Sequence, residues 1–101
     1  MIVLHAEIPV DPDRKEEALE LAEFLVEESN EESGMIEYRA AVDVQDENVI
    51  RFFEQYENEQ ALEAHTRFDH YQEFEERLPE LVAGEPEVMR FDVSEATELE
   101  V

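Results

Sequence analysis

The fold is decided by residues 52–65, which read Phe52-Phe53-Glu54-Gln55-Tyr56-Glu57-Asn58-Glu59-Gln60-Ala61-Leu62-Glu63-Ala64-His65. The first residues alternate as in a β-strand, and Asn58 is a favourable N-cap for a helix that follows directly. Two of the three histidines, two of the three tyrosines and four of the six phenylalanines lie between residues 52 and 74. We therefore expect any active site in this part of the chain.

Outward from this stretch, strand and helix patterns alternate along the chain. Strand-like alternation runs through residues 2–10, 35–44, 49–57 and 88–94, and helical periodicity through residues 14–30, 59–68 and 69–82. Asp13 and Asp69 each stand three residues before a Glu or Gln, as in a capping box, so we expect them to cap their helices. Pro79 is expected to end or kink its helix. In the last strand, Met89, Phe91 and Val93 are expected on the core side.

The order strand, helix, strand, strand, helix, strand predicts an α+β fold. With right-handed crossovers it gives a ferredoxin-like βαββαβ arrangement, in which a four-stranded antiparallel sheet carries the helices on one face. The chain of 101 residues is expected to be a single domain, residues 1–101, with an acidic C-terminal tail at about 95–101.

The sheet face away from the helices is expected to mix apolar and basic residues. It would carry Val3, His5, Glu7, Met35, Glu37, Arg39, Val49, Arg51, Phe53, Gln55, Val88 and Arg90. Such a face is unusually apolar and basic for the solvent side of an acidic protein. We expect a homodimer that buries this face against a second copy of the chain.

Composition narrows the setting of the protein. Asp and Glu number 30 against 7 Lys and Arg, and the formal net charge is −23. A hydrophobic content of 43% and the regular periodicity exclude the possibility that the chain as a whole is a disordered acidic segment. Two explanations stay open: adaptation to very high salt, which we favour because molar salt screens charges within about 3 Å, and mimicry of nucleic acid or binding to basic proteins.

Other features exclude whole classes of chemistry. Direct binding of nucleic acid needs a cationic patch that 7 scattered basic residues do not supply. Without cysteine there is no disulfide or thiolate chemistry, and without a signal peptide or a long apolar run we expect a cytoplasmic protein with no membrane partner. The histidines lack the spacing of paired metal ligands, so we expect no metal site.

The catalytic candidates are His65, His70, Glu54 and Tyr56, and the substrate-binding candidates are Phe52, Phe68, Tyr71 and Phe74. Glu54 is the one charged residue on the helix-facing side of its strand, where it either orients a histidine or ties the sheet to a helix. His65 is either part of a site or a satisfied core histidine, and His70 either a base at a helix N-terminus or a surface capping residue. The aromatic residues form either a slot for a planar ligand or ordinary core packing.

At this point the sequence resembles the antibiotic biosynthesis monooxygenase domain family, whose members are dimeric α+β barrels. The resemblance runs from Met1-Ile2-Val3 and Ala6-Glu7-Ile8-Pro9-Val10 to about Phe91, and its most specific parts are residues 53–65, His70-Tyr71 and Leu78-Pro79-Glu80-Leu81. The family has Trp or Tyr at the place of Tyr56, then an Ala-Leu pair, and then two histidines.

This resemblance implies either a cofactor-free oxygenase of phenols or quinols or a protein without assigned activity. In haem-degrading members the resemblance implies a histidine ligand at a place that falls near Glu75 in this chain, and an asparagine in the first strand. Neither is evident in this sequence, so haem is not expected. In the oxygenase hypothesis His65 or His70 removes a proton, Glu54 holds that base, and Tyr56 binds the substrate oxygen. The rival is a non-catalytic, small-molecule-binding or stress-related dimer with a filled core in which Glu54 and His65 satisfy each other.

Overall fold

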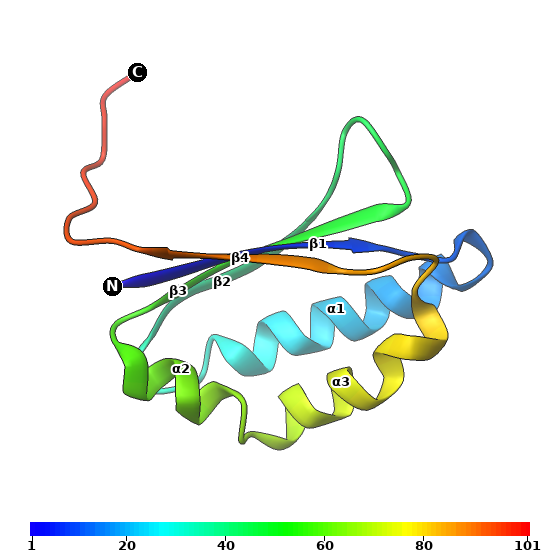
Figure 1. Cartoon of the computed structure of the whole chain (residues 1–101), viewed down its shortest axis with the longest axis horizontal. Coiled ribbons are helices and arrows are strands. Elements are labelled where there is room, and N and C mark those ends of the chain that lie inside the picture. Colours follow the sequence, from blue (N-terminus) through cyan, green and yellow to red (C-terminus); the bar gives the residue numbers. More distant parts are fainter.

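A computed structural model describes residues 1–101. The elements are β1 (Ile2–Pro9), a short 3-10 turn η1 (Pro12–Arg14), α1 (Lys15–Ser29), β2 (Met35–Val42), β3 (Val49–Tyr56), α2 (Glu59–His65), α3 (Asp69–Leu81) and β4 (Glu87–Asp92). The strands form one antiparallel sheet in the order β2-β3-β1-β4, and the helices cover one of its faces (Figure 1). The predicted α+β ferredoxin-like fold is confirmed. None of the helices has the length and hydropathy that crossing a lipid bilayer requires.

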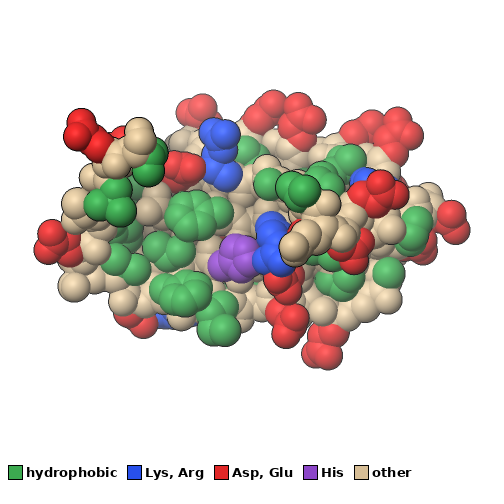
Figure 2. Space-filling view, turned by 90° about the horizontal axis from the view of Figure 1, so that it is seen from above, with side chains coloured by type: hydrophobic (Ala, Val, Ile, Leu, Met, Phe, Trp, Pro, Cys, Tyr) green, Lys and Arg blue, Asp and Glu red, His purple; other side chains and the backbone are tan.

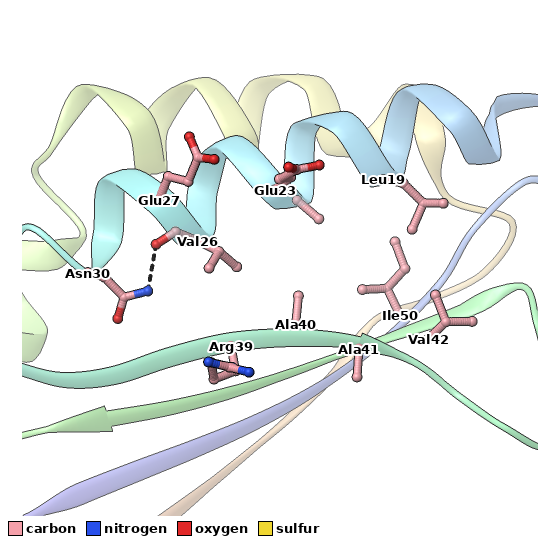
Figure 3. Close-up of a pocket in the computed structure, with 11 residues that line it drawn as sticks. Leu19, Glu23, Val26, Glu27, Asn30, Arg39, Ala40, Ala41, Val42 and Ile50 are labelled. Carbon is pink, nitrogen blue, oxygen red and sulfur yellow. Dashed lines mark hydrogen bonds between the residues drawn. The ribbon is translucent and has the colours of Figure 1, made fainter.

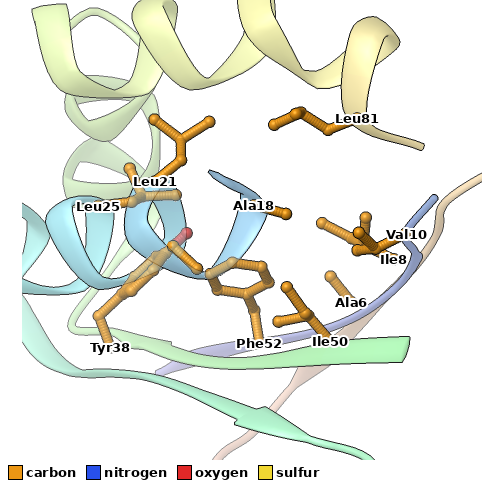
Figure 4. Packing of buried hydrophobic residues seen from close by; sticks show 11 residues of the cluster. Ala6, Ile8, Val10, Ala18, Leu21, Leu25, Tyr38, Ile50, Phe52 and Leu81 are labelled. Carbon is orange, nitrogen blue, oxygen red and sulfur yellow. The ribbon is translucent and has the colours of Figure 1, made fainter. Parts of the chain in front are cut away.

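The main core lies between the sheet and the helices (Figure 4). Its buried members are Ala6, Ile8, Val10, Ala18, Leu21, Ala22, Leu25, Tyr38, Ile50, Phe52 and Leu81. Helix α1 contributes four of them because a spacing of three and four residues places side chains on one side of a helix. A smaller cluster of Ile2, Tyr56 and Ala61 joins the end of β3 to the start of α2.

The direct passage from β3 into α2 is stabilised by the predicted cap. Asn58 is extended, and its Oδ1 accepts a hydrogen bond from the backbone N–H of Ala61 at 2.9 Å. Capping of this kind contributes about 1 kcal/mol. The cap fixes where α2 begins, and so how far His65 lies from the sheet.

The other two predicted caps are wrong. Asp11, not Asp13, receives the capping hydrogen bond, from the backbone N–H of Asp13 at 2.9 Å, and it starts η1 rather than α1. Helix α3 begins at Asp69 itself, after an extended Phe68 whose side chain makes no capping bond. Pro79 lies in the last turn of α3, which ends at Leu81 as the missing proline N–H leads one to expect.

The faces of β4 are reversed from the prediction. The pairing with β1 sets Met89 opposite His5 and Phe91 opposite Val3. Paired residues point to the same side of a sheet, so Met89 and Phe91 lie on the open face. The alternate positions, Val88 and Arg90, face the helices. A short strand with apolar residues on both sides does not reveal which side meets the core, and the register with β1 decides it.

A β-bulge at the start of β2 reverses a second assignment. The register with β3 shifts between Met35 and Glu37, which leaves Ile36 without a partner. Met35 pairs with Tyr56 and packs on the core, whereas Ile36, predicted to face inward, is 49% exposed. One extra residue in a strand moves the preceding side chain to the other face.

The open sheet face is apolar over much of its area and bordered by acidic side chains (Figure 2). Phe53, Met89 and Phe91 are 40%, 60% and 49% exposed there. His5 lies between Phe53 and Met89 in the register, and its Nε2 is 3.3 Å from Nη1 of Arg51. Exposed apolar patches with a polar rim are typical of interaction surfaces.

Candidate functional site

A cavity of about 150 Å³ lies between the sheet and helices α2 and α3. Its polar lining residues are Tyr38, Glu54, His65, Thr66, Tyr71 and Glu75, and most of its remaining wall is apolar. Neither lysine nor arginine contributes to the lining. An apolar cavity with a few convergent polar groups is the usual form of a small-molecule site.

His65, the last residue of α2, presents an unpartnered nitrogen in this region. Its Nδ1 lies 2.8 Å from Oε2 of Glu32. Because a carboxylate only accepts, this contact places the proton on Nδ1 and leaves a lone pair on Nε2. Nε2 is buried and has no hydrogen-bond partner within the protein. Burial lowers the pKa of His65, although Glu32 opposes this, so the neutral form with a free acceptor is favoured.

Glu32 lies in the turn after α1 and joins the two histidines. Its Oε2 also accepts a hydrogen bond from Nε2 of His70, at 2.6 Å, and its carboxylate is buried. His70 itself does not line the cavity. Its ring stacks on Phe68, with 5.1 Å between centroids, and both line a separate depression on the protein surface. His70 and Phe68, which we expected at the site, are therefore not part of the cavity wall.

The group of Glu32, His65 and His70 could also bind a divalent metal ion. One ligand atom from each residue lies within 4.8 Å of the others. Two imidazoles and a carboxylate are a ligand set that zinc and iron accept. The sequence spacing did not reveal this group because Glu32 precedes His65 by 33 residues. Hydrogen bonds to Glu32 satisfy both N–H groups in the arrangement described here.

Glu54 lies on the cavity wall as a buried carboxylate. Its Oε1 accepts a hydrogen bond from the hydroxyl group of Tyr56 at 2.6 Å. Burial raises the pKa of Glu54 to about 7, and the hydroxyl groups of Tyr56 and Tyr38 partly oppose this increase. No hydrogen bond joins Glu54 to His65, so the contact that we expected between them is absent, and Glu32 is the carboxylate that holds the histidine.

Tyr56 lies behind Glu54 rather than on the cavity wall. It is fully buried, and burial together with the neighbouring Glu54 raises its pKa, which keeps the hydroxyl protonated as a donor. Tyr38 is buried beside it, and its pKa is raised by the same two causes. Tyr56 therefore positions Glu54 and has no surface with which to bind a substrate oxygen.

Three predicted aromatic residues line the cavity: Phe52, Tyr71 and Phe74. Phe52 and Phe74 meet edge to face with 5.7 Å between ring centroids. Tyr71 packs against His65 at 5.0 Å between centroids, and its hydroxyl donates to Glu75. Together with Glu54 and His65 they make five of the eight predicted residues that meet at the cavity.

Two residues at this site were not among the candidates. Tyr38 lies on the cavity wall, and its inward position is consistent with the alternation of β2, so the pattern could have identified it. Glu32 had no such signal, because it is one of 30 acidic residues and lies in a turn.

A larger depression of about 600 Å³ lies between α1 and the edge strand β2 (Figure 3). Its walls are mostly apolar, and the Asn30 side chain donates to the carbonyl of Val26 at one end. The charged residues along it are exposed, and none of the predicted site residues lines it. Its size therefore does not make it the better candidate for chemistry.

Comparison with known proteins gives consistent matches. The family model described as antibiotic biosynthesis monooxygenase matches residues 1–77. YcnE of Bacillus subtilis, provisionally named a monooxygenase, is 36% identical over 95 residues, which are 94% of this chain and 100% of that protein. The uncharacterised protein sll1783 of Synechocystis is 35% identical over 98 residues, or 97% of this chain and 67% of that protein. A crystal structure from Deinococcus radiodurans, provisionally described as an antibiotic biosynthesis monooxygenase, covers both chains fully with a TM-score of 0.92; its identity of 15% supports the fold alone.

Proposed function

The chain belongs to the antibiotic biosynthesis monooxygenase family, and we propose that it oxidises a phenolic or quinol-type small molecule with O2, without a metal or organic cofactor. The observation that carries the proposal is that His65 lines an aromatic-walled cavity and that its buried Nε2 has no hydrogen-bond partner in the protein. A buried acceptor of this kind is suited to take the proton of a substrate hydroxyl group.

The size of the cavity favours a substrate with one aromatic ring. At about 150 Å³ it matches cavities that hold a benzene-sized ligand. Pockets for drug-sized ligands are about 300–1,000 Å³. A haem group is at least as large as such ligands, so it is much too large for this cavity. Glu75, near which the resemblance places the histidine ligand of haem-degrading members, accepts a hydrogen bond from Tyr71. These features support a small phenol rather than haem.

The first step in this proposal is proton transfer. The substrate hydroxyl donates to Nε2 of His65, and the imidazolium that results keeps its Nδ1–H bond to Glu32. A buried carboxylate stabilises such a cation, as in a catalytic triad. The phenolate is more electron-rich than the phenol, and so it can reduce O2 in one-electron steps.

The overall reaction balances without another reductant. For a hydroquinone, a ring carbon forms a bond to one oxygen atom of O2, the O–O bond breaks, and the second oxygen leaves as water. The substrate supplies all four electrons and becomes a hydroxyquinone. The proton held by His65 returns to the departing oxygen.

The remaining residues would position the ring. Glu54 would accept a hydrogen bond from a second substrate hydroxyl, with Tyr56 holding the carboxylate in place. Phe52 and Phe74 would lie against the ring and exclude water. The rival, non-catalytic binder predicts a filled core and a bond between Glu54 and His65. A cavity at His65 and separate partners for Glu54 and His65 support the enzyme. A cavity that touches both histidines would count further against the rival, but His70 does not line this one.

The test is oxygen consumption by the purified protein in molar KCl with EDTA. We expect uptake with one-ring hydroquinones and phenols, faster than the uncatalysed rate, and little with polycyclic quinols that exceed the cavity. The product should gain one oxygen atom from ¹⁸O2. Absence of uptake with the whole panel, or uptake that chelation abolishes, would contradict the proposal.

We also propose that two copies of the chain, in the cytoplasm, pair through the open sheet face. The exposed Phe53, Met89 and Phe91 would be buried there, and the acidic rim explains why high salt should favour pairing. Light scattering in 2 M KCl is expected to give twice the chain mass for the wild-type protein. The Met89→Glu variant is expected to give the mass of a single chain. A monomeric wild-type protein in molar salt would contradict the dimer.

A further inference from the structure

We propose that the preferred substrate is a phenolic ring that carries a protonated amine, with the ammonium group bound by Glu54. The inference rests on the proposed function for the role of the hydroxyl group, and goes beyond it in assigning a charge to the substrate. It is carried by Glu54, a buried acidic residue that lines an aromatic cavity and has no cation beside it.

Glu54 has no cationic partner in the protein. Every Arg–carboxylate ion pair is at the surface and involves Arg14, Arg51, Arg77 or Arg90. Arg90 is on the helix side of β4, but it is bound to Glu59 at 2.7 Å and to Asp92 at 3.0 Å. Since burying an unpaired carboxylate is costly, a cation supplied by the ligand would be strongly favoured at Glu54.

The walls of the cavity are suited to a cation as well. Tyr38, Phe52, Tyr71 and Phe74 all line it, and aromatic faces attract ammonium groups. Glu75 adds a second carboxylate to the lining, while lysine and arginine contribute nothing. An anionic substituent on the ring would meet two carboxylates and no positive charge.

The proposed chemistry gives a further reason for an amine. Loss of the phenol proton places a negative charge near the carboxylates of Glu54 and Glu32, and like charges disfavour this anion. A protonated amine on the same ring offsets Glu54 and lowers the cost of forming the phenolate. Small phenolic amines also fit a cavity of about 150 Å³.

The experiment compares three ligands of nearly equal shape by isothermal titration calorimetry without O2. They are tyramine, which is cationic, tyrosol, which is neutral, and 4-hydroxyphenylacetate, which is anionic. In 1 M KCl, where the general attraction of an acidic surface is screened, tyramine should bind about tenfold tighter than tyrosol and the anion more weakly still. Glu54→Gln should remove the difference between tyramine and tyrosol, and Glu63→Gln, an exposed carboxylate on α2, should leave it unchanged.

Equal affinities for tyramine and tyrosol in 1 M KCl would overturn the inference. So would a preference for tyramine that survives Glu54→Gln, because it would come from the surface charge. Binding is measured without turnover, so the two proposals fail separately. Oxygen uptake with neutral hydroquinone but no preference for the amine removes only this inference. Preference for the amine without oxygen uptake removes only the monooxygenase.

Discussion

Replacing His65 by glutamine is expected to slow substrate-dependent oxygen uptake by about 10²–10⁴-fold, the usual contribution of a general base. The change removes the buried, unpartnered Nε2 of a histidine that lines the cavity. Because glutamine is of similar length and still offers a donor to Glu32, we expect the fold to survive. Steady-state oxygen-electrode kinetics measure the rate, and circular dichroism checks the structure.

Glu32 provides the matched test, since it acts on the substrate only through His65. Glu32→Gln should lower kcat by about 10–10²-fold with little change in KM, because the imidazolium loses its counter-charge while the cavity wall stays intact. Glu32→Asp should recover part of the rate. Glu31→Gln, at the exposed neighbouring position, is the control.

Wild-type rates in the folded His65→Gln protein would show that this histidine is not the base.

Replacing Glu54 by glutamine is expected to stabilise the protein by about 3 kcal/mol at pH 8 and hardly at all at pH 4. Burial raises the pKa of Glu54 from 4.5 to about 7 in the folded state. An acidic group whose pKa is raised in the folded state destabilises the protein only at pH values at which the group is ionised in the unfolded chain. The cost is therefore absent below about pH 4.5, grows between about 4.5 and 7, and is complete above 7.

Chemical denaturation in urea at fixed KCl across this pH range measures the effect. The wild-type free energy of unfolding should fall relative to that of Glu54→Gln as the pH rises, since glutamine still accepts the hydrogen bond from Tyr56. Glu63→Gln, at the exposed position on α2, corrects for the removal of one negative charge from an acidic surface. A difference between the two variants that does not change between pH 4 and 8 would contradict the raised pKa.

Local signals in the sequence were enough for most of the fold. Alternation and helical spacing placed the strands and helices, and Asn58 marked the start of α2 because a cap depends only on residues three apart. The same local signals failed for the faces of β4 and for Ile36. Those faces are determined by the register with β1 and by a bulge against β3, which involve residues distant in the chain.

The sequence by itself determined the element order, the acidic character of the chain and the concentration of titratable and aromatic residues in positions 52–74. Only the tertiary structure decided which of those residues share a cavity. It placed Glu32 between the two histidines, and it left His70 outside the cavity wall, beside a separate depression. The physical reason is that hydrogen-bond partners are set by distance in space. A turn after α1 approaches the end of α2 only when both helices pack on the sheet, and no spacing along the chain records that approach.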